Sequence, residues 1–173
     1  METFLEIVKI TVPALIVFLT VYFVMKTYLD KQYQIQLLQF KKDQKNTTTP
    51  LKLQAYERLS LFCERISIPN LVLRMKTKGA SSAALRVSLL MAVQQEFEHN
   101  ISQQIYISDQ LWEIIKLART ETIELINSVS EKVDMKSDSD QLANALVNVY
   151  ASMERSATQS ALSAIRQEAA LMI

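Results

Sequence analysis

The residue types most suited to chemistry surround the only histidine of the chain, in the run Glu96-Phe97-Glu98-His99-Asn100. A zinc site in a protein needs three or four convergent ligands, commonly spaced by one helical turn. On a helix, Glu96 is the one ligand type that shares a face with His99, so the pattern of a metal site is incomplete. The structural alternative places His99 in the last turn of a helix, where a histidine interacts favourably with the helix dipole.

The single cysteine, Cys63, excludes an intramolecular disulfide and a cysteine metal cluster. It lies beside Leu61 and Phe62 on an amphipathic pattern, which favours a buried structural thiol over an activated nucleophile. The chain has one glycine, and this excludes the glycine-rich loops of nucleotide and dinucleotide sites. The sequence therefore predicts no catalytic residue, no metal ligand and no cofactor.

The elements that position these residues are predicted to be helices. One Gly and three Pro in 173 residues supply few of the turns that a sheet protein needs, whereas Leu, Ala, Gln, Glu and Lys favour helix. The expected fold is all-α: an N-terminal transmembrane helix that continues into a juxtamembrane helix, then a compact bundle of about five helices.

The segment Ile10 to Met25 contains sixteen residues without a charge. A helix needs about 20 predominantly apolar residues to span a bilayer, so Lys9 and Lys26 are expected near the two interfaces. A signal peptide would have a basic start and small residues at a cleavage site, and this segment has neither. We therefore expect a transmembrane anchor over residues 1–27, with a buried core helix as the alternative.

Lysines indicate the orientation of this anchor. Lys9 alone precedes the apolar segment, whereas five lysines follow it within twenty residues: Lys26, Lys31, Lys41, Lys42 and Lys45. The positive-inside rule then places the N-terminus outside and the C-terminal domain in the cytoplasm, on a single-pass protein of the inner membrane. The same five lysines are candidates for contact with lipid head groups.

Residues 28–45 are expected to form a juxtamembrane amphipathic helix. Its apolar residues recur at the spacing of one helical stripe: Leu29, Tyr33, Leu37 and Phe40. Such a stripe needs a partner, either a second copy of the chain or the protein's own domain. We expect a homo-oligomer in which this stripe is the interface.

Residues 46–173 are expected to form a cytoplasmic helical domain. Thr49 as N-cap and Pro50 at the first helical position predict the start of a helix that runs to about Ile66. A connector follows, with a short helical turn and a basic tip at Arg74, Lys76 and Lys78. Thirteen Lys or Arg against fourteen Asp or Glu give this domain no general attraction for nucleic acid.

Capping residues predict the remaining helices. Ser81 or Ser82 starts a helix to about His99, and Ser108 or Asp109 starts the longest helix of the domain. Asp138 with Gln141 and Ser156 with Gln159 match the capping-box pattern and predict two more. The apolar faces are expected at Ala83, Val87, Leu90 and Phe97 on the first of these helices, and at Leu111, Ile115, Ala118, Thr122, Leu125, Val129 and Val133 on the longest.

The order of the segments resembles a family of uncharacterised, single-span, membrane-anchored, all-helical bacterial proteins. The resemblance rests on the N-terminal span, TPLKLQAYERLSLFCERI (Thr49 to Ile66), LVLRM (Leu71 to Met75), QEFEHNISQQIYIS (Gln95 to Ser108) and LWEIIKLA. It implies an architecture and adds no catalytic residue. Within it, the stretch around His99 is the most distinctive, and it is where a partner-binding or helix-junction role is expected.

These observations predict a non-enzymatic scaffold or accessory subunit that binds protein partners, or itself, at the cytoplasmic face of the membrane. Tyr106 and Trp112 are expected to pack in the core or to serve as aromatic anchors for a partner. The residues expected to bind a partner are Glu96, Glu98, His99, Asn100, Gln104, Tyr106 and Trp112. The alternative is a membrane-tethered enzyme or metal-binding protein centred on His99 with Glu96 and Glu98.

Overall fold

A computed structural model describes the backbone of residues 1–172 and most of their side chains. The side chains of residues 2–8, 10–11, 14, 37 and 40–47 and the whole of residue 173 lie outside the described residues. Leu37, Phe40, Lys41, Lys42 and Lys45 belong to this set, so their predicted roles are not tested. The described residues form seven helices and no strand, which confirms the all-α prediction.

The chain divides into two compact units, residues 1–48 and residues 49–173. Helix α1 (Glu2–Ile66) contributes to both of them. The prediction that a new helix begins at Pro50 is wrong, because the backbone is already helical through residues 46–50. Pro50 has no N–H to donate to the carbonyl of Asn46, so the helix lacks one hydrogen bond where the two units divide.

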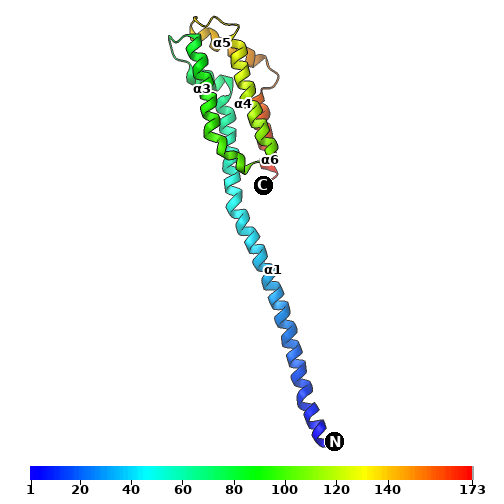
Figure 1. The fold of residues 1–173 in the computed structure, drawn as a ribbon. Helices are drawn as coiled ribbons and strands as arrows, with labels where there is room; N and C mark the ends of the chain where they lie inside the picture. The colour runs from blue at the N-terminus through cyan, green and yellow to red at the C-terminus, as the bar shows by residue number, and fades with distance from the viewer. Residues whose placement is uncertain (173) are drawn as a thin grey trace. The chain divides into compact units, whose positions relative to one another are not determined.

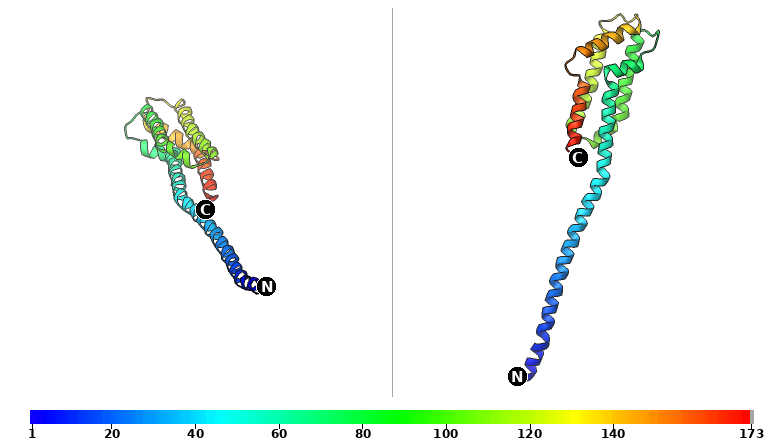
Figure 2. Two further views of the ribbon diagram at one scale, coloured as in Figure 1. Left: turned by 60° about the horizontal axis from the view of Figure 1, so that its bottom comes forward. Right: turned by 180° about the vertical axis from the view of Figure 1, so that it is seen from behind.

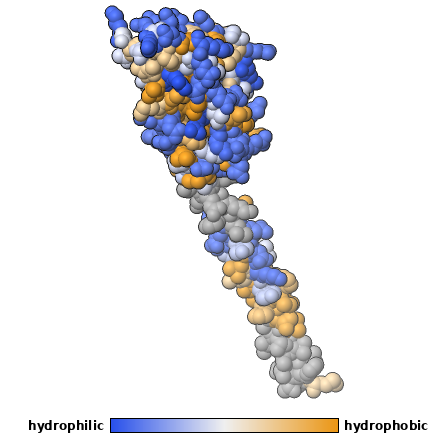
Figure 3. All heavy atoms as spheres, turned by 45° about the horizontal axis from the view of Figure 1, so that its top comes forward, coloured by the Kyte–Doolittle hydropathy of each residue, from blue (hydrophilic) through white to orange (hydrophobic). Residues whose placement is uncertain are grey.

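The first unit is helical and carries a band of apolar side chains. The large side chains described between Val12 and Met25 are all exposed, and they form the orange band of this unit in Figure 3. The side-chain hydroxyls of Thr20 and Thr27 each donate a hydrogen bond to the backbone carbonyl four residues earlier. Within the described residues, no helix combines the length and the apolar character needed to cross a membrane. The span predicted over residues 1–27 therefore stays a prediction.

The second unit is a helical bundle (Figures 1 and 2). Its further helices are α2 (Ile68–Met75), α3 (Ser82–Asn100), the 3-10 helix η1 (Ile101–Tyr106), α4 (Asp109–Ser130), α5 (Ser139–Ser152) and α6 (Ala157–Ala170). Helix α4 packs against both α3 and α6, and α5 crosses one end of the bundle (Figure 1). The opposite end holds η1, the start of α4 and the C-terminal turn of α6.

Serine hydroxyls start three of these helices, as the sequence predicts. Ser81 accepts from the N–H of Ala84, and Ser108 accepts from the N–H of Leu111. Ser156 and Gln159 form a complete capping box. Such caps satisfy N–H groups that have no partner within the helix, so they fix where each helix begins. Asp138 also caps α5, though it accepts from the N–H of Asp140 rather than from that of Gln141.

The buried face of α3 agrees only in part with the predicted one, because Leu90 and Phe97 pack against the core as predicted. The predicted residues Ala83 and Val87 are exposed, while Leu85 and Leu89 are buried instead. On α4 the prediction is largely correct: Leu111, Ile115, Ala118, Thr122 and Val129 are buried. The core joins side chains from α1, α2, α3, α4, α5 and α6 into one cluster, centred on residues such as Phe62, Leu89, Ile115 and Leu146.

The end of the bundle crossed by α5 is closed by hydrogen bonds between two loops. The N–H of Ser82 donates to Ser137, and that of Ser139 donates to Ala80. Gly79 has a positive φ of 77°, which a residue with a side chain rarely adopts, and this allows the turn before α3. Lys76 of the predicted basic tip, just after α2, pairs with Asp140 in the first turn of α5 at 2.7 Å.

Candidate partner-binding groove

A carboxylate that bonds two arginines lies at one side of the bundle. Oε1 of Glu96 accepts from Arg74 at 3.0 Å, and Oε2 accepts from Arg65 at 3.3 Å. A second N–H of Arg74 donates to the backbone carbonyl of Arg65 at 3.0 Å. These contacts connect α3 with α2 and with the end of α1. Because both oxygens of Glu96 are occupied by guanidinium groups, the carboxylate has a structural role in this arrangement.

A groove of about 450 Å³ lies next to this carboxylate, between α1 and the C-terminal half of α3. Its floor includes the buried ring of Phe62, and the exposed side chain of Leu61 stands on its wall. The complete lining is Gln54, Glu57, Arg58, Leu61, Phe62, Arg65, Glu96, His99 and Asn100.

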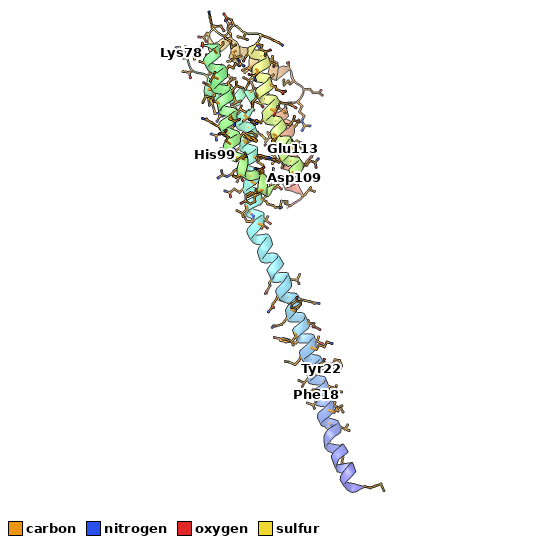
Figure 4. All side chains as sticks on the ribbon, viewed as in Figure 1. Phe18, Tyr22, Lys78, His99, Asp109 and Glu113 are labelled. Carbon is orange, nitrogen blue, oxygen red and sulfur yellow. The ribbon has the colours of Figure 1, made fainter. Side chains whose placement is uncertain are left out.

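A second hollow of about 360 Å³ adjoins the first and shares Gln54, Arg58 and His99 with it. It extends over η1, where Ile105 and Tyr106 form part of the wall. Figure 4 shows His99 near the end of the bundle where α4 begins at Asp109. The two hollows therefore form one surface groove, which we call the α1/α3 groove.

The predicted partner-binding residues separate into groups. Glu96, His99 and Asn100 line the groove, whereas exposed Glu98 bonds to Gln94 on the outer face of α3. Asn100 is buried and donates to the carbonyl of Glu96 at 2.8 Å, so it holds the end of α3.

Of the remaining predicted residues, Tyr106 lines the groove and Trp112 does not. Gln104 is exposed on η1 and is not among the lining residues. Trp112 stacks on Phe97 with ring centroids 5.5 Å apart, and both rings pack against the core. The guanidinium of Arg119 lies over the ring of Phe97, 4.6 Å from its centroid. Trp112 therefore packs against the core, and its use as an anchor for a partner stays a prediction.

The thiol of Cys63 is buried in the core cluster, away from the groove lining. Burial is the main cause that raises its pKa from an ordinary 9.0 to about 12, and the nearby carboxylate of Glu64 adds to the effect. Burial therefore favours the protonated form of this thiol, as is usual for a structural cysteine.

The described residues contain no group of three or more His, Cys, Asp and Glu side chains placed to hold a metal ion. Near His99, the carboxylate of Glu96 is already engaged by Arg65 and Arg74. The geometry therefore gives no support to a metal centre that uses Glu96.

Sequence reasoning missed two arginines of the groove, Arg58 and Arg65. Both are exposed on α1 at a spacing of seven residues, and they line the groove together with Leu61, which stands between them in the sequence. The periodic placement of an exposed leucine between arginines on a helix was the available signal.

A second cluster that the sequence did not reveal joins three helices at the end of the bundle. The carboxylate of Glu168 on α6 accepts from the N–H and the hydroxyl of Ser108, the N-cap of α4. It also accepts from the buried hydroxyl of Tyr56 on α1 at 3.1 Å. Burial first, and then the bond to Glu168 and its charge, raise the pKa of Tyr56 from 10.0 to about 12.

Comparison with known families identifies the chain's relatives. A family of unknown function, DUF7935, has a model that matches residues 2–172. The chain belongs to this family. The match covers both structural units, so the N-terminal helix and the bundle are parts of one family architecture. Neither the curated proteins nor the solved structures gave a match.

Proposed function

We propose that this member of the DUF7935 family is a non-enzymatic, membrane-anchored scaffold whose helical domain binds protein partners at the cytoplasmic face of the membrane. The observation that carries the proposal is the uncharged segment Ile10 to Met25, which is followed by a helical bundle. A groove on this bundle is lined by both polar and apolar side chains. An apolar helix that is exposed on all sides requires either lipid or protein around it.

The exposure of the first unit supports the anchor. Phe18, Phe23 and Val24 expose 69%, 62% and 62% of their surfaces, and they point to different sides of the helix. A soluble helix normally confines such residues to one side. Lipid around this segment removes all of this apolar surface from water at once, whereas a single groove on a partner covers only one side.

The lysines after the apolar segment support the orientation. Positively charged residues near a span are enriched on the cytoplasmic side, and here five lysines follow the segment whereas Lys9 alone precedes it. In this arrangement Lys26 and Lys31, whose side chains are exposed, lie close to anionic head groups.

Self-association through the stripe that contains Leu29 and Tyr33 is part of the same proposal. These two side chains expose 57% and 65% of their surfaces and lie one helical turn apart. Anchoring confines all copies to one plane with one orientation, which raises their effective concentration for a parallel helix–helix contact.

Labelling of introduced cysteines in intact cells tests the anchor and its orientation together. The native thiol Cys63 is buried and does not compete for the reagent. We expect a membrane-impermeant maleimide to label Thr3→Cys in intact cells, and to label Ser128→Cys, an exposed position of α4, only after lysis. Labelling of Ser128→Cys from outside would refute the orientation, and labelling of neither position in intact cells would refute the exposed N-terminus.

A further inference from the structure

We propose that the α1/α3 groove holds helix α1 of a second copy of this chain, so that two copies form a parallel dimer about a two-fold axis. The inference rests on the proposed function and deepens it, because it extends self-association from the juxtamembrane stripe to the bundle. Three features lead to it: the charges left unpaired in the groove, the spacing of the residues on its α1 wall, and the common orientation of anchored chains.

The charges of the groove are balanced, and one pair of them is unused within the chain. The lining holds two arginines and two glutamates. Of these, Arg65 and Glu96 bond to each other at 3.3 Å. The side chains of Glu57 and Arg58 are exposed, and among the described residues neither has an ion pair or a hydrogen bond. One free carboxylate beside one free guanidinium gives no preference for a uniformly acidic or a uniformly basic partner.

Such a pair of charges is complementary to itself. A two-fold dimer brings the same patch of both copies together, and each contact between two different residues occurs twice with the roles exchanged. When Glu57 of one copy faces Arg58 of the other, Arg58 of the first copy faces Glu57 of the second. Two ion pairs between a guanidinium and a carboxylate then form from a single patch. A second copy supplies both partners by symmetry, whereas an unrelated protein would need its own matching pair.

The α1 wall of the groove has the spacing of a coiled-coil seam. Its residues follow one another at alternating intervals of three and four: Leu51, Gln54, Arg58, Leu61 and Arg65. These are the a and d positions of the heptad repeat. In the sequence, three residues of the juxtamembrane stripe fall on the same register. Tyr33 and Phe40 precede Leu61 by four and three heptads, and Leu37 precedes Leu51 by two. One heptad register in the sequence therefore includes both the stripe and the groove wall.

A parallel arrangement follows from the proposed anchor. Copies that are inserted with one orientation meet side by side, and their confinement to one plane raises their effective concentration. In a parallel two-stranded seam identical residues lie opposite each other, so Leu61 packs on Leu61 of the second copy. Glu57, at the g position that flanks the seam, then borders Arg58 of the second copy. Ile105 of η1 lines the second hollow together with Leu51 and adds exposed apolar surface beside the seam.

Disulfide formation between introduced cysteines locates the contact in the full-length chain. Membranes that contain equal amounts of each variant are treated with a mild oxidant, and the buried native thiol of Cys63 does not compete. We expect Leu61→Cys to give at least about tenfold more covalent dimer than Leu117→Cys, because a disulfide requires Cα atoms closer than about 7 Å. Leu117 on α4 is the matched control, since the two leucines expose 59% and 55% of their surfaces. A yield for Leu61→Cys no higher than that of the control would overturn the inference.

An exchange of charges tests the reciprocal ion pairs, with Leu61→Cys present in every chain. Glu57→Arg or Arg58→Glu alone places like charges opposite each other and should lower the yield of covalent dimer about tenfold. Glu57→Arg combined with Arg58→Glu restores the complementarity and should recover the yield, which also shows that the exchanged chain folds. When the two single variants are expressed together, the mixed dimer should exceed either dimer of identical chains. Arg166→Glu, a reversal at an exposed position of α6, is the control and should leave the yield unchanged.

Each other result overturns the inference. Single charge variants with an undiminished yield, or a double exchange that stays as low as they do, would exclude the reciprocal ion pairs. Cross-linking of Leu61→Cys to a protein of different mass would assign the groove to another partner. Cross-linking of Tyr33→Cys without that of Leu61→Cys would confine self-association to the juxtamembrane stripe, and the proposed function would stand without the groove contact. Cross-linking at neither position would overturn self-association itself, and membrane association is measured separately by carbonate extraction, so a failed dimer and a failed anchor are distinguished.

Discussion

Glu96 holds α2 and the end of α1 against α3 through two arginines, and its side chain is only 13% exposed. We expect Glu96→Gln to lower the free energy of unfolding by about 1–3 kcal/mol, because two partly desolvated guanidinium groups lose their counter-charge. Arg65→Ala should cost less than about 1 kcal/mol, since that side chain is 55% exposed and its ion pair is screened. Urea denaturation measures both. Glu124→Gln at an exposed position of α4 is the control, and an equal loss there would contradict the role of Glu96.

Cys63 and Tyr56 give the stability of the bundle a predictable dependence on alkaline pH. Both have a raised pKa in the folded state, about 12 against ordinary values of 9.0 and 10.0. The folded chain thus holds these protons more tightly than the unfolded chain, so their contribution is complete below about pH 9 and is lost as the pH rises toward 12. Urea midpoints at increasing pH should fall in this window, and Cys63→Ala should flatten the first part of the fall. A Cys63→Ala chain with the same pH profile as the native chain would contradict this account.

At the scale of the elements, Glu168 connects α6 to the start of α4 and to α1 through Ser108 and Tyr56. Glu168→Ala should cost about 2 kcal/mol, the usual value for hydrogen bonds to a charged group, and Tyr56→Phe about 1 kcal/mol. The double variant should lose less than the sum, because both changes remove the same bond. Thermal or urea unfolding of the three variants measures this coupling. Strictly additive losses would show that Tyr56 and Glu168 act independently.

The juxtamembrane stripe gives a prediction that rests on sequence. Leu37→Asp or Phe40→Asp should lower the mass of the particle extracted in mild detergent, because a carboxylate in an apolar helix–helix contact is costly. Gln34→Asp, on another side of the same helix, is the control and should leave the mass unchanged. Mass photometry of the extracted chain distinguishes these outcomes, and an unchanged mass for both stripe variants would eliminate this interface.

The beginnings of helices were predictable because a cap is a local property. Ser81, Ser108 and Ser156 each accept from the N–H group three residues later, so the signal lies within a few letters of sequence. The face of α3 was not predictable in the same way. Two apolar stripes coexist on this helix, one with Val87 and one with Leu85 and Leu89, and only packing with other helices decides which is buried.

The candidate groove was predictable on its α3 side and not on its α1 side. The run around His99 has several polar residue types within one helical turn, which marks it as unusual. Arg58 and Arg65 are ordinary surface residues in the sequence, and the fold brings them into one groove with Glu96, which lies more than 30 residues later in the chain. Contacts at such separations depend on tertiary structure and leave no local pattern.

On the scale of the whole molecule, one chain combines an apolar N-terminal segment with a bundle that has its own core. Among the described residues, the buried core of the bundle runs from Ala55 to Ile165. The large apolar side chains described between Val12 and Met25 are all exposed, which leaves the apolar segment free for another environment. We propose that this segment serves as a membrane anchor.

The most direct test of this account is whether the full-length chain stays in the membrane pellet after extraction with alkaline carbonate, which releases proteins that do not span the bilayer. We predict that the native chain stays in the pellet and that Val17→Arg combined with Val21→Arg releases it, because two charges near the centre of a span are costly by about 2.5–3.5 kcal/mol each. Val87→Arg, at a position of α3 with the same 55% exposure as Val21, should stay in the pellet. A native chain found in the supernatant would contradict the central claim.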